Sequence, residues 1–462
     1  MGRNMQSATS EARTLVSHPE LTSHKSFPSF RTGGEPPRGP LERFLSFFAD
    51  VRAGEGTAAL LMMVTVFILL ASYYLLKVAR EQLVLTEGSA IIKAQASGAQ
   101  AILLMAVVPI FGWLGTKVNR IRLITITSLF FAGNLLLFYV LGQAGVREGV
   151  VFYIWLGIYN LFVVSQFWAF ANDIYTEGQG RRLFPLIGVG ASLGAWIGST
   201  SVPTLIKTYG FTPYTLMLAG AIMLVMALAV TRVINHMQRN PSQPEAAKIE
   251  AATLGKEGGF QLIWKDVYLR WIAILIVLLN VVNTTGEYLL SELITRAAPP
   301  GEEAAEDFIG VFYGQFFGWV NLVGFVLQLF FASRAIRYLG VRGSLFILPV
   351  IALLNYSVIA VVPLLAVVRI GKILENATDY SIQNTVRHAL FLPTSREVKY
   401  KAKNAIDTFF TRVGDVIAAG VATLGVYLGW QISGFGYLMI AFTLVWLFVA
   451  LQIAREHRKK TA

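Results

Sequence analysis

Residues 57–80 read TAALLMMVTVFILLASYYLLKVAR, an apolar run that meets charge only in its last turn. As a helix this segment is about 36 Å long, more than the ~30 Å hydrocarbon core of a bilayer. Further segments of spanning length follow. We place them all near 57–80, 91–115, 123–142, 150–175, 183–206, 213–234, 262–291, 308–333, 343–361, 363–386, 403–429 and 433–454. The sequence therefore predicts an all-α membrane protein with twelve transmembrane helices, several of them interrupted by charge.

The composition agrees with this class. Of the 462 residues, 55% are hydrophobic and 14% are charged, whereas soluble proteins average about 25% charged residues. Basic residues that gather in cytoplasmic loops account for a net charge of +12. No Lys/Arg run with interleaved aromatic residues lies outside the apolar spans, so we expect no binding of nucleic acid.

Several enzyme classes are excluded by what the sequence lacks. It has no cysteine, and its five histidines lie in tails, loops or helix ends. Thiolate metal centres, cysteine nucleophiles and a serine triad at membrane depth are therefore excluded. Neither HExxH nor a GxxxxGK[ST] phosphate loop occurs. We expect neither an enzyme nor an ATP-driven pump, and no cofactor or metal site.

Basic residues alternate along the chain in a way that orients the helices. They gather after the second, fourth, eighth and tenth segments and at the C-terminus. The positive-inside rule then places both termini in the cytoplasm. We expect a bacterial inner (plasma) membrane, a plastid envelope being the less favoured alternative. The predicted organisation is a disordered tail with a short amphipathic helix at 41–53 (1–53 in all), a six-helix bundle (54–234), a cytoplasmic linker (235–261), a second six-helix bundle (262–454) and a basic tail (455–462).

The two bundles resemble each other in sequence. Gly190, Gly194 and Gly198 lie four residues apart in the fifth segment, and Gly414 begins a similar series of small residues in the eleventh. Small residues at this spacing let helices approach closely in lipid, so we interpret them as packing positions and not as a phosphate loop. Two pseudo-symmetric bundles of six helices are the architecture of the major facilitator superfamily, whose substrate site lies between the bundles.

Charges within the tenth segment must avoid lipid. In AVVRIGKILENATDYSIQNTV (366–386), five polar residues fall on one stripe: Arg369, Lys372, Glu375, Asn376 and Asp379. A charge at mid-membrane costs about 2.5–3.5 kcal/mol on insertion scales. This face must look into the protein. It either contacts a substrate or forms a neutralised cluster that locks helices together.

Acidic stripes occur in two further segments. The seventh places Asn283 and Glu287 on one face, and a desolvated glutamate can bind a proton or a cation. The alternative is a glutamate bonded to a neighbouring Arg or Lys. The eleventh places Asp407 and Asp415 on one face beside Arg412.

The first segment ends with charge. Tyr73, Lys77 and Arg80 share a helix face, and Glu81 follows. The alternative to a buried role is that these charges snorkel to the outer interface. Asn172 lies near the inner end of the fourth segment.

At these residues the sequence resembles the ATP/ADP translocases of intracellular bacteria and plastids. The most specific stretch is FWAFANDIYTEGQGRRLFPLIGVGASLGA (167–195). The end of the first segment and the basic entry into the eleventh are also similar to the family. The matching residues are Phe167, Trp168, Phe170, Ala171, Asn172, Arg182, Phe184, Pro185, Leu186 and Gly188, then Arg80, Glu81, Leu83 and Val84, and finally Lys401, Lys403, Asp407, Arg412 and Gly414.

The resemblance implies a carrier that exchanges external ATP for internal ADP plus phosphate. It implies that Arg80 and Arg412, with Lys77 and Lys372, meet the phosphates. Tyr73 or Tyr74 would stack on the base. Two positions depart from the family pattern, because Glu287 and Asp415 stand at places where the family carries lysine.

Three functions follow as hypotheses. The first is a nucleotide antiporter that works by alternating access. The second is a proton- or cation-coupled carrier of a zwitterionic or cationic solute, suggested by the two inverted charges. The third is a non-transporting membrane scaffold. In the first two, the partners are a small-molecule substrate and the lipid bilayer, and we expect a monomer.

The candidate site combines two groups of residues. The candidate substrate-binding residues are Tyr73, Lys77, Arg80, Asn172, Asn283, Arg369, Lys372, Asn376 and Arg412. The candidate coupling or gating residues are Glu81, Glu287, Glu375, Asp379, Asp407 and Asp415.

Overall fold

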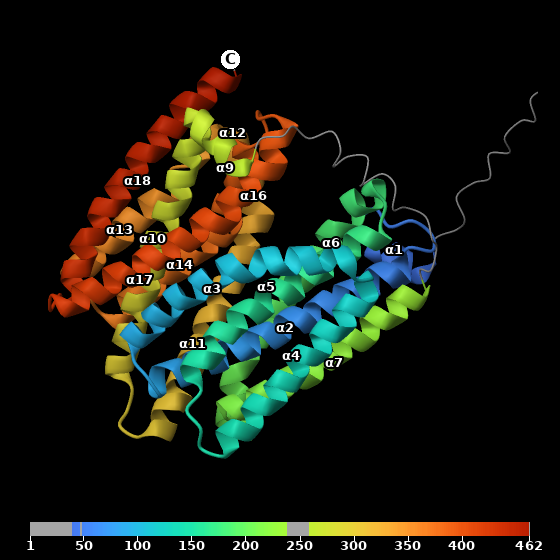
Figure 1. The fold of residues 1–462 in the computed structure, drawn as a ribbon, viewed down its shortest axis with the longest axis horizontal. Helices are drawn as coiled ribbons and strands as arrows, with labels where there is room; N and C mark the ends of the chain where they lie inside the picture. The colour runs from blue at the N-terminus through green and yellow to red at the C-terminus, as the bar shows by residue number, and fades with distance from the viewer. Residues whose placement is uncertain (1–38, 47–48, 238–257, 462) are drawn as a thin grey trace, which may run out of the picture.

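The computed structural model describes residues 39–46, 49–237 and 258–461, which form an all-helical chain in two bundles (Figure 1). The first half comprises α1 (Pro40–Leu45), α2 (Gly56–Thr86), α3 (Ala90–Lys117), α4 (Arg120–Gln143), α5 (Gly149–Ile174), α6 (Glu177–Tyr209) and α7 (Pro213–Met237). The second half comprises α9 (Gly259–Lys265), α10 (Val267–Ala297), α11 (Glu302–Val326), η1 (Leu327–Ala332), α12 (Ser333–Ser344), α13 (Ile347–Val361), α14 (Leu365–Thr378), η2 (Asp379–Gln383), α15 (Asn384–Leu390), η3 (Val398–Ala402), α16 (Lys403–Ala405), η4 (Ile406–Phe410), α17 (Thr411–Tyr427) and α18 (Ile432–Thr461), where η marks a π-helical turn.

The predicted helical membrane fold is confirmed. Within the described residues, 10 helices are long and apolar enough to cross a membrane. The shorter apolar helix α13 and the charged stretch α14–η2–α15 complete the twelve crossings. The stretch α14–η2–α15 is less apolar than the other crossings because it carries the polar stripe of the tenth predicted segment.

Local capping explains where several helices begin. The Asp266 carboxylate accepts a hydrogen bond from the backbone N–H of Tyr268, so the seventh crossing starts at Val267 and the short helix α9 precedes it. Thr176 and Gln179 form a capping box at the start of α6. Each cap satisfies backbone N–H groups that a helix start leaves without partners.

The N-terminal helix is shorter than the predicted range 41–53, because α1 ends at Leu45. Residues 49–55 are instead held against α6. Arg182 donates to the Asp50 carbonyl and pairs with Glu55 at 2.9 Å, and Gln179 donates to the same carboxylate. Residues 1–38 and 238–257, which include most of the predicted tail and linker, lie outside the described residues.

In each bundle, small residues let one helix pack closely against another. A Cβ added at Gly190, Gly194 or Gly198 of α6 would lie 2.3–2.6 Å from backbone carbonyl oxygens of α2. In the second half, a Cβ at Gly414 of α17 would meet α10 at 2.6–2.8 Å. The predicted packing role of both series is confirmed, and the two halves repeat the same contact between their first and fifth helices.

The two halves meet on one side of the molecule. We call the side where α2 begins and α18 ends the termini side, and the opposite side the far side. The hydrogen bonds that join described residues of the two halves run from mid-depth to the far side, and include Gln82 Nε2 to the Glu306 carbonyl at 3.0 Å. Figure 1 shows the bundles diverging toward α1 and the C-terminus. This is the shape of a carrier closed on its far side.

The glycine contact between α2 and α6 gives a stability test. Gly194→Ala should lower the free energy of unfolding by about 1–3 kcal/mol, because its Cβ would lie 2.3 Å from the Phe67 carbonyl oxygen. Gly188→Ala on the same helix is the matched control, since nothing lies within 4 Å of its Cβ position. The control should be neutral or gain up to about 1 kcal/mol from helix propensity. Thermal unfolding in detergent measures both, and equal behaviour of the two variants would contradict the assignment.

Candidate functional site

A buried ionic network ties the two halves together near the far side. Glu81, which is 1% exposed, pairs with Arg80 beside it on α2 and with Lys93 of α3, whose Nζ lies 2.6 Å away. Lys93 also donates to Ser291 of α10 at 2.7 Å and lies 3.5 Å from the Tyr313 hydroxyl of α11. Opening of the far side must therefore break contacts made by Lys93.

A second network is built on α14 and α10. Lys372 is fully buried, and its Nζ donates to Glu375 at 3.1 Å and to the Asn283 side-chain oxygen at 2.6 Å. Glu287 accepts from Asn376 at 2.7 Å and lies 3.8 Å from the Lys372 ammonium. The part of the stripe formed by Lys372, Glu375 and Asn376 thus points into the protein, as its cost in lipid required.

Arg412 and Asp415 form a third pair on α17. The Arg412 guanidinium donates to the Asp415 carboxylate at 3.0 Å, and Thr284 of α10 donates to the same carboxylate at 3.0 Å. The Arg412 side chain keeps 31% of its surface exposed. Its charge acts on Tyr73 of α2, so it faces the opposite half of the molecule.

Lys77 differs from the other central cations. Its ammonium lies 4.0 Å from the ring centroid of Phe317 and 5.3 Å from that of Tyr74. Among the described residues, Lys77 makes no ion pair with a carboxylate within 4 Å. Cation–π contacts stabilise a cation without neutralising it. Lys77 is therefore the cation best placed to meet an anionic substrate.

Some side chains around these residues remain partly exposed. Tyr380 of η2 is 48% exposed although it lies within electrostatic range of Tyr73, Tyr74 and Glu287. The Glu287 side chain keeps 26% of its surface. Lys77 lies nine residues before the end of α2 and Glu287 ten before the end of α10, about 14–15 Å of helix in each case. Both halves thus contribute side chains to one site at similar depth.

One cation of this site is left without an ion pair. The five central cations are Lys77, Arg80, Lys93, Lys372 and Arg412, and the carboxylates paired with them are Glu81, Glu287, Glu375 and Asp415. Lys77, on the first-half side, makes no ion pair within 4 Å among the described residues and lies against the rings of Phe317 and Tyr74.

Four predicted site residues lie outside this cluster. Asn172 is exposed in the last turn of α5, on the termini side, and Asp407 pairs there with Arg387 and Lys403. Asp379 lies within electrostatic range of Lys372 and Arg387 but none of the described side chains hydrogen-bonds its Oδ1. Arg369 points toward α11, as described below. Helical spacing predicts which residues share a helix face. It does not predict how far along the helix each residue lies from the central cluster.

Three contributors were not predicted. Lys93 lies in the first turn of α3, where a lysine reads as an interfacial anchor. Tyr153 stacks under the Arg80 guanidinium at 4.3 Å, and Tyr313 contacts Lys93. Glu81 could have pointed to Lys93 in the sequence. A glutamate at membrane depth needs a partner for each carboxylate oxygen, and Arg80 binds only one of them.

The far side also collects carboxylates from both halves. Glu87 caps the end of α2 and accepts from the Gly149 backbone N–H at 2.6 Å, and Glu148 precedes α5. Glu302 of α11 acts on Glu87. Both oxygens of Glu148 are buried and have no hydrogen-bond partner among the described residues. Burial and then Glu87 raise the pKa of Glu148 to about 7.

The fold and the site together define a membrane transporter of the twelve-helix, two-bundle class. A bacterial homologue of the iron transporter ferroportin, in an inward-facing state, superposes with a TM-score of 0.63 at 13% identity, over 86% of this chain and 98% of that one. The nucleoside transporter NupG gives a TM-score of 0.59 at 14% identity, over 86% and 98%. These similarities confirm the major facilitator type of fold.

The family follows from the sequence match. The model of the TLC ATP/ADP transporter family matches residues 148–457. The chain therefore belongs to the TLC ATP/ADP transporter family, which confirms both the resemblance and the prediction that it is not an enzyme.

Its relatives are distant. ADP,ATP carrier protein 1 of Chlamydia trachomatis is 23% identical over 351 residues, 66% of this chain and 64% of that protein. The chloroplastic ADP,ATP carrier protein 1 of Arabidopsis thaliana is 25% identical over 299 residues, 57% of this chain and 46% of that protein. This chain spans less than two thirds of the length of these relatives. Such relatives occur in bacteria and in plastids, and this chain is a multi-pass membrane protein.

The far-side carboxylates predict a pH-dependent equilibrium. Glu148 and Glu87 both have raised pKa values in the far-side-closed conformation. Burial and Glu87 raise the pKa of Glu148, whereas burial raises the pKa of Glu87, to which Glu302 of the second half adds and which Arg147 opposes, so closure of the two halves contributes through Glu302. A conformation in which a carboxyl has a raised pKa binds its proton more tightly, so it gains stability as the pH falls through about 7 and loses it as the pH rises. We therefore expect the closed population to rise between about pH 8 and about pH 6.

Spin-label distances can test this equilibrium. The chain has no native cysteine, so the exposed far-side positions Val146 and Ala304 can be labelled as V146C and A304C. The short-distance population should grow on acidification, and Glu148→Gln should flatten that dependence. Glu177→Gln, an exposed acid on the termini side, should retain it. Distances that do not change with pH would contradict the prediction.

Proposed function

We propose that this chain exchanges nucleotides of the ATP/ADP type across a bacterial inner membrane by alternating access, with both termini in the cytoplasm. The observation that carries the proposal is Lys77, a cation that makes no ion pair within 4 Å among the described residues, in a site lined by both halves. A family described as ATP/ADP transporters and relatives named ADP,ATP carriers support the substrate class.

The phosphates would meet the cations of the first half. Lys77 has only ring contacts, so it can turn to a phosphate oxygen without leaving a carboxylate unpaired. Arg80 and Arg412 keep partly exposed side chains while they hold their acidic partners. A charge-assisted contact with phosphate is among the stronger hydrogen bonds.

The base would rest on tyrosine. Tyr73 and Tyr74 pack edge to face with ring centroids 5.3 Å apart, and the exposed Tyr380 lies on the other side of the same space. Stacking of a base on an aromatic side chain contributes about 1–3 kcal/mol and tolerates different bases. The site thus has an aromatic part beside a cationic part, which matches a nucleotide.

Charge also favours exchange over net transport. Closing the site around an unbalanced cation removes that cation from water, which is costly in a low-dielectric interior. A bound nucleotide supplies the missing negative charge. The loaded carrier should therefore change conformation more readily than the empty one, so that each outward step is coupled to an inward step.

Lys77 gives the direct test. Lys77→Met keeps an unbranched side chain against Phe317 and Tyr74 but removes the charge, so exchange of external labelled ATP for internal ADP in proteoliposomes should fall about tenfold or more. Lys207→Met, at an exposed position near the far end of α6, is the matched control and should exchange normally. Wild-type exchange by the Lys77 variant, with its thermal stability unchanged, would overturn the assignment.

A second candidate function rests on Glu287. Its carboxylate is partly exposed, accepts one hydrogen bond from Asn376 and shares Lys372 with Glu375. Such a group can take up a proton or a cation, so the chain would then be a coupled carrier of a zwitterionic or cationic solute.

Glu287→Gln separates the two functions. If Glu287 couples transport to protons, the variant should lose the pH dependence of uptake and the stimulation by an imposed proton gradient. If the chain is a nucleotide exchanger, the variant should keep ATP/ADP exchange, because the substitution removes a negative charge beside the phosphates. Uptake assays with and without a gradient, on wild type and variant in parallel, give the answer. Gradient-driven uptake that survives in the variant would exclude Glu287 as the coupling residue.

A further inference from the structure

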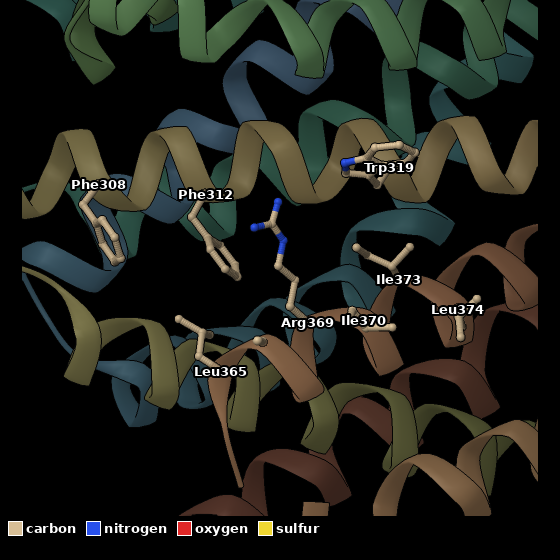
Figure 2. Close-up of a pocket in the computed structure, with 9 residues that line it drawn as sticks. Phe308, Phe312, Trp319, Leu365, Arg369, Ile370, Ile373 and Leu374 are labelled. Atoms are coloured by element: carbon tan, nitrogen blue, oxygen red, sulfur yellow. The ribbon is translucent and has the colours of Figure 1, made fainter. Parts of the chain in front are cut away.

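A groove opens between α11 and α14 on the outside of the second bundle (Figure 2). Its volume is about 810 Å³, within the range of about 300–1,000 Å³ typical of ligand pockets. Phe308, Phe312 and Trp319 line it from α11. Leu365, Ile370 and Leu374 are among its lining residues from α14. The walls are apolar apart from one charged side chain.

That side chain is Arg369. Figure 2 shows it rising from α14 toward α11, with its guanidinium between Phe312 and Trp319. It donates to the neutral Gln315 side chain at 3.1 Å and lies 4.9 Å from the Phe312 ring centroid. Among the described residues, no carboxylate lies within 4 Å of the Arg369 guanidinium, so none of them forms an ion pair with it.

The groove faces the membrane. Trp319 is 55% exposed and Ile370 is 61% exposed, and both lie within helices that cross the bilayer. Arg369 is four residues from the far-side start of α14, about 6 Å along the helix. Leu374 lies about 14 Å from the same start and Trp319 about 26 Å from the start of α11. The groove therefore runs along the two helices from near the far-side start of α14 toward the termini side.

We propose that this groove binds an anionic phospholipid of the far-side leaflet, with the headgroup phosphate on Arg369 and an acyl chain along α11 and α14. The length, depth and apolar lining match an acyl chain, and the single unbalanced cation matches a phosphate. A soluble anion would fit the cation but would use none of the apolar lining beside it. Arg369 is thus assigned to lipid and not to the transported substrate.

The site lies on the helix that carries the second ionic network. Arg369 and Lys372 are one turn apart on α14, with Arg369 turned to the groove and Lys372 buried against α10. A lipid held by Arg369 would therefore bias how α14 sits against α10 and α11. This inference does not depend on which solute the chain transports.

The test uses the purified full chain in a neutral detergent. Phosphatidylglycerol, diacylglycerol with the same acyl chains, and glycerol phosphate are titrated separately, while thermal unfolding is followed and bound lipid is counted by native mass spectrometry. We expect phosphatidylglycerol alone to raise the unfolding temperature. Arg369→Gln should weaken its apparent affinity about fivefold or more. Arg147→Gln, an exposed arginine on the same side of the membrane, should leave the affinity unchanged.

A second variant keeps the test decisive if Arg369→Gln does not fold. Ala366→Trp places a large side chain in the groove and leaves Arg369 in place, so it should abolish lipid binding. Full binding by both variants would overturn the proposal. Equal stabilisation by diacylglycerol would show an apolar groove without a phosphate site, and equal stabilisation by glycerol phosphate would show a free-anion site; either result also overturns it.

Discussion

The bilayer cannot hold an isolated charge, and the arrangement of this protein follows from that constraint. The charged residues in the middle of the tenth crossing must face protein or water, because exposure to hydrocarbon would cost several kilocalories. Lys372 is accordingly buried against α10, where Glu287, Glu375 and Asn283 surround it. Glu81 has the same role near the end of the first crossing, where it binds Arg80 and Lys93. The polar stripes decide which face of each helix lines the site, and the lipid-facing surface is what remains.

Much of this could be predicted from the sequence, because apolar length and charge at helical spacing are local properties. The crossings, the packing role of Gly194 and the inward orientation of Glu375 needed no knowledge of neighbours. Pairing could not be predicted in the same way. Lys93 meets Glu81 and Ser291 only because two loops and a bundle interface bring three helices together. For the same reason, spacing alone placed Arg369 with the substrate-binding residues, whereas its neighbour α11 turns it toward lipid.

The structure gives partners to the two acidic residues of the second half that depart from the family pattern. Glu287 and Asp415 stand where the resembling translocases carry lysine, yet each is paired here, Glu287 with Asn376 and Lys372, and Asp415 with Arg412 and Thr284. The central cation that makes no ion pair within 4 Å among the described residues, Lys77, lies in the first half. A substrate would bind asymmetrically, with its anionic end toward α2 and its other end toward the second bundle.

The two bundles also differ in their π-helical turns. All four described turns of this kind, η1 to η4, lie in the second half, on the eighth, tenth and eleventh crossings. Such turns carry one extra residue per bulge and mark places where a helix can change register at the cost of few hydrogen bonds. In the described part of the chain, the long helices of the first half contain no such turn, but α3 holds Pro109 and α6 holds Pro185 and Pro203. The two bundles therefore differ in the places that favour a bend: prolines in the first half and π-helical turns in the second.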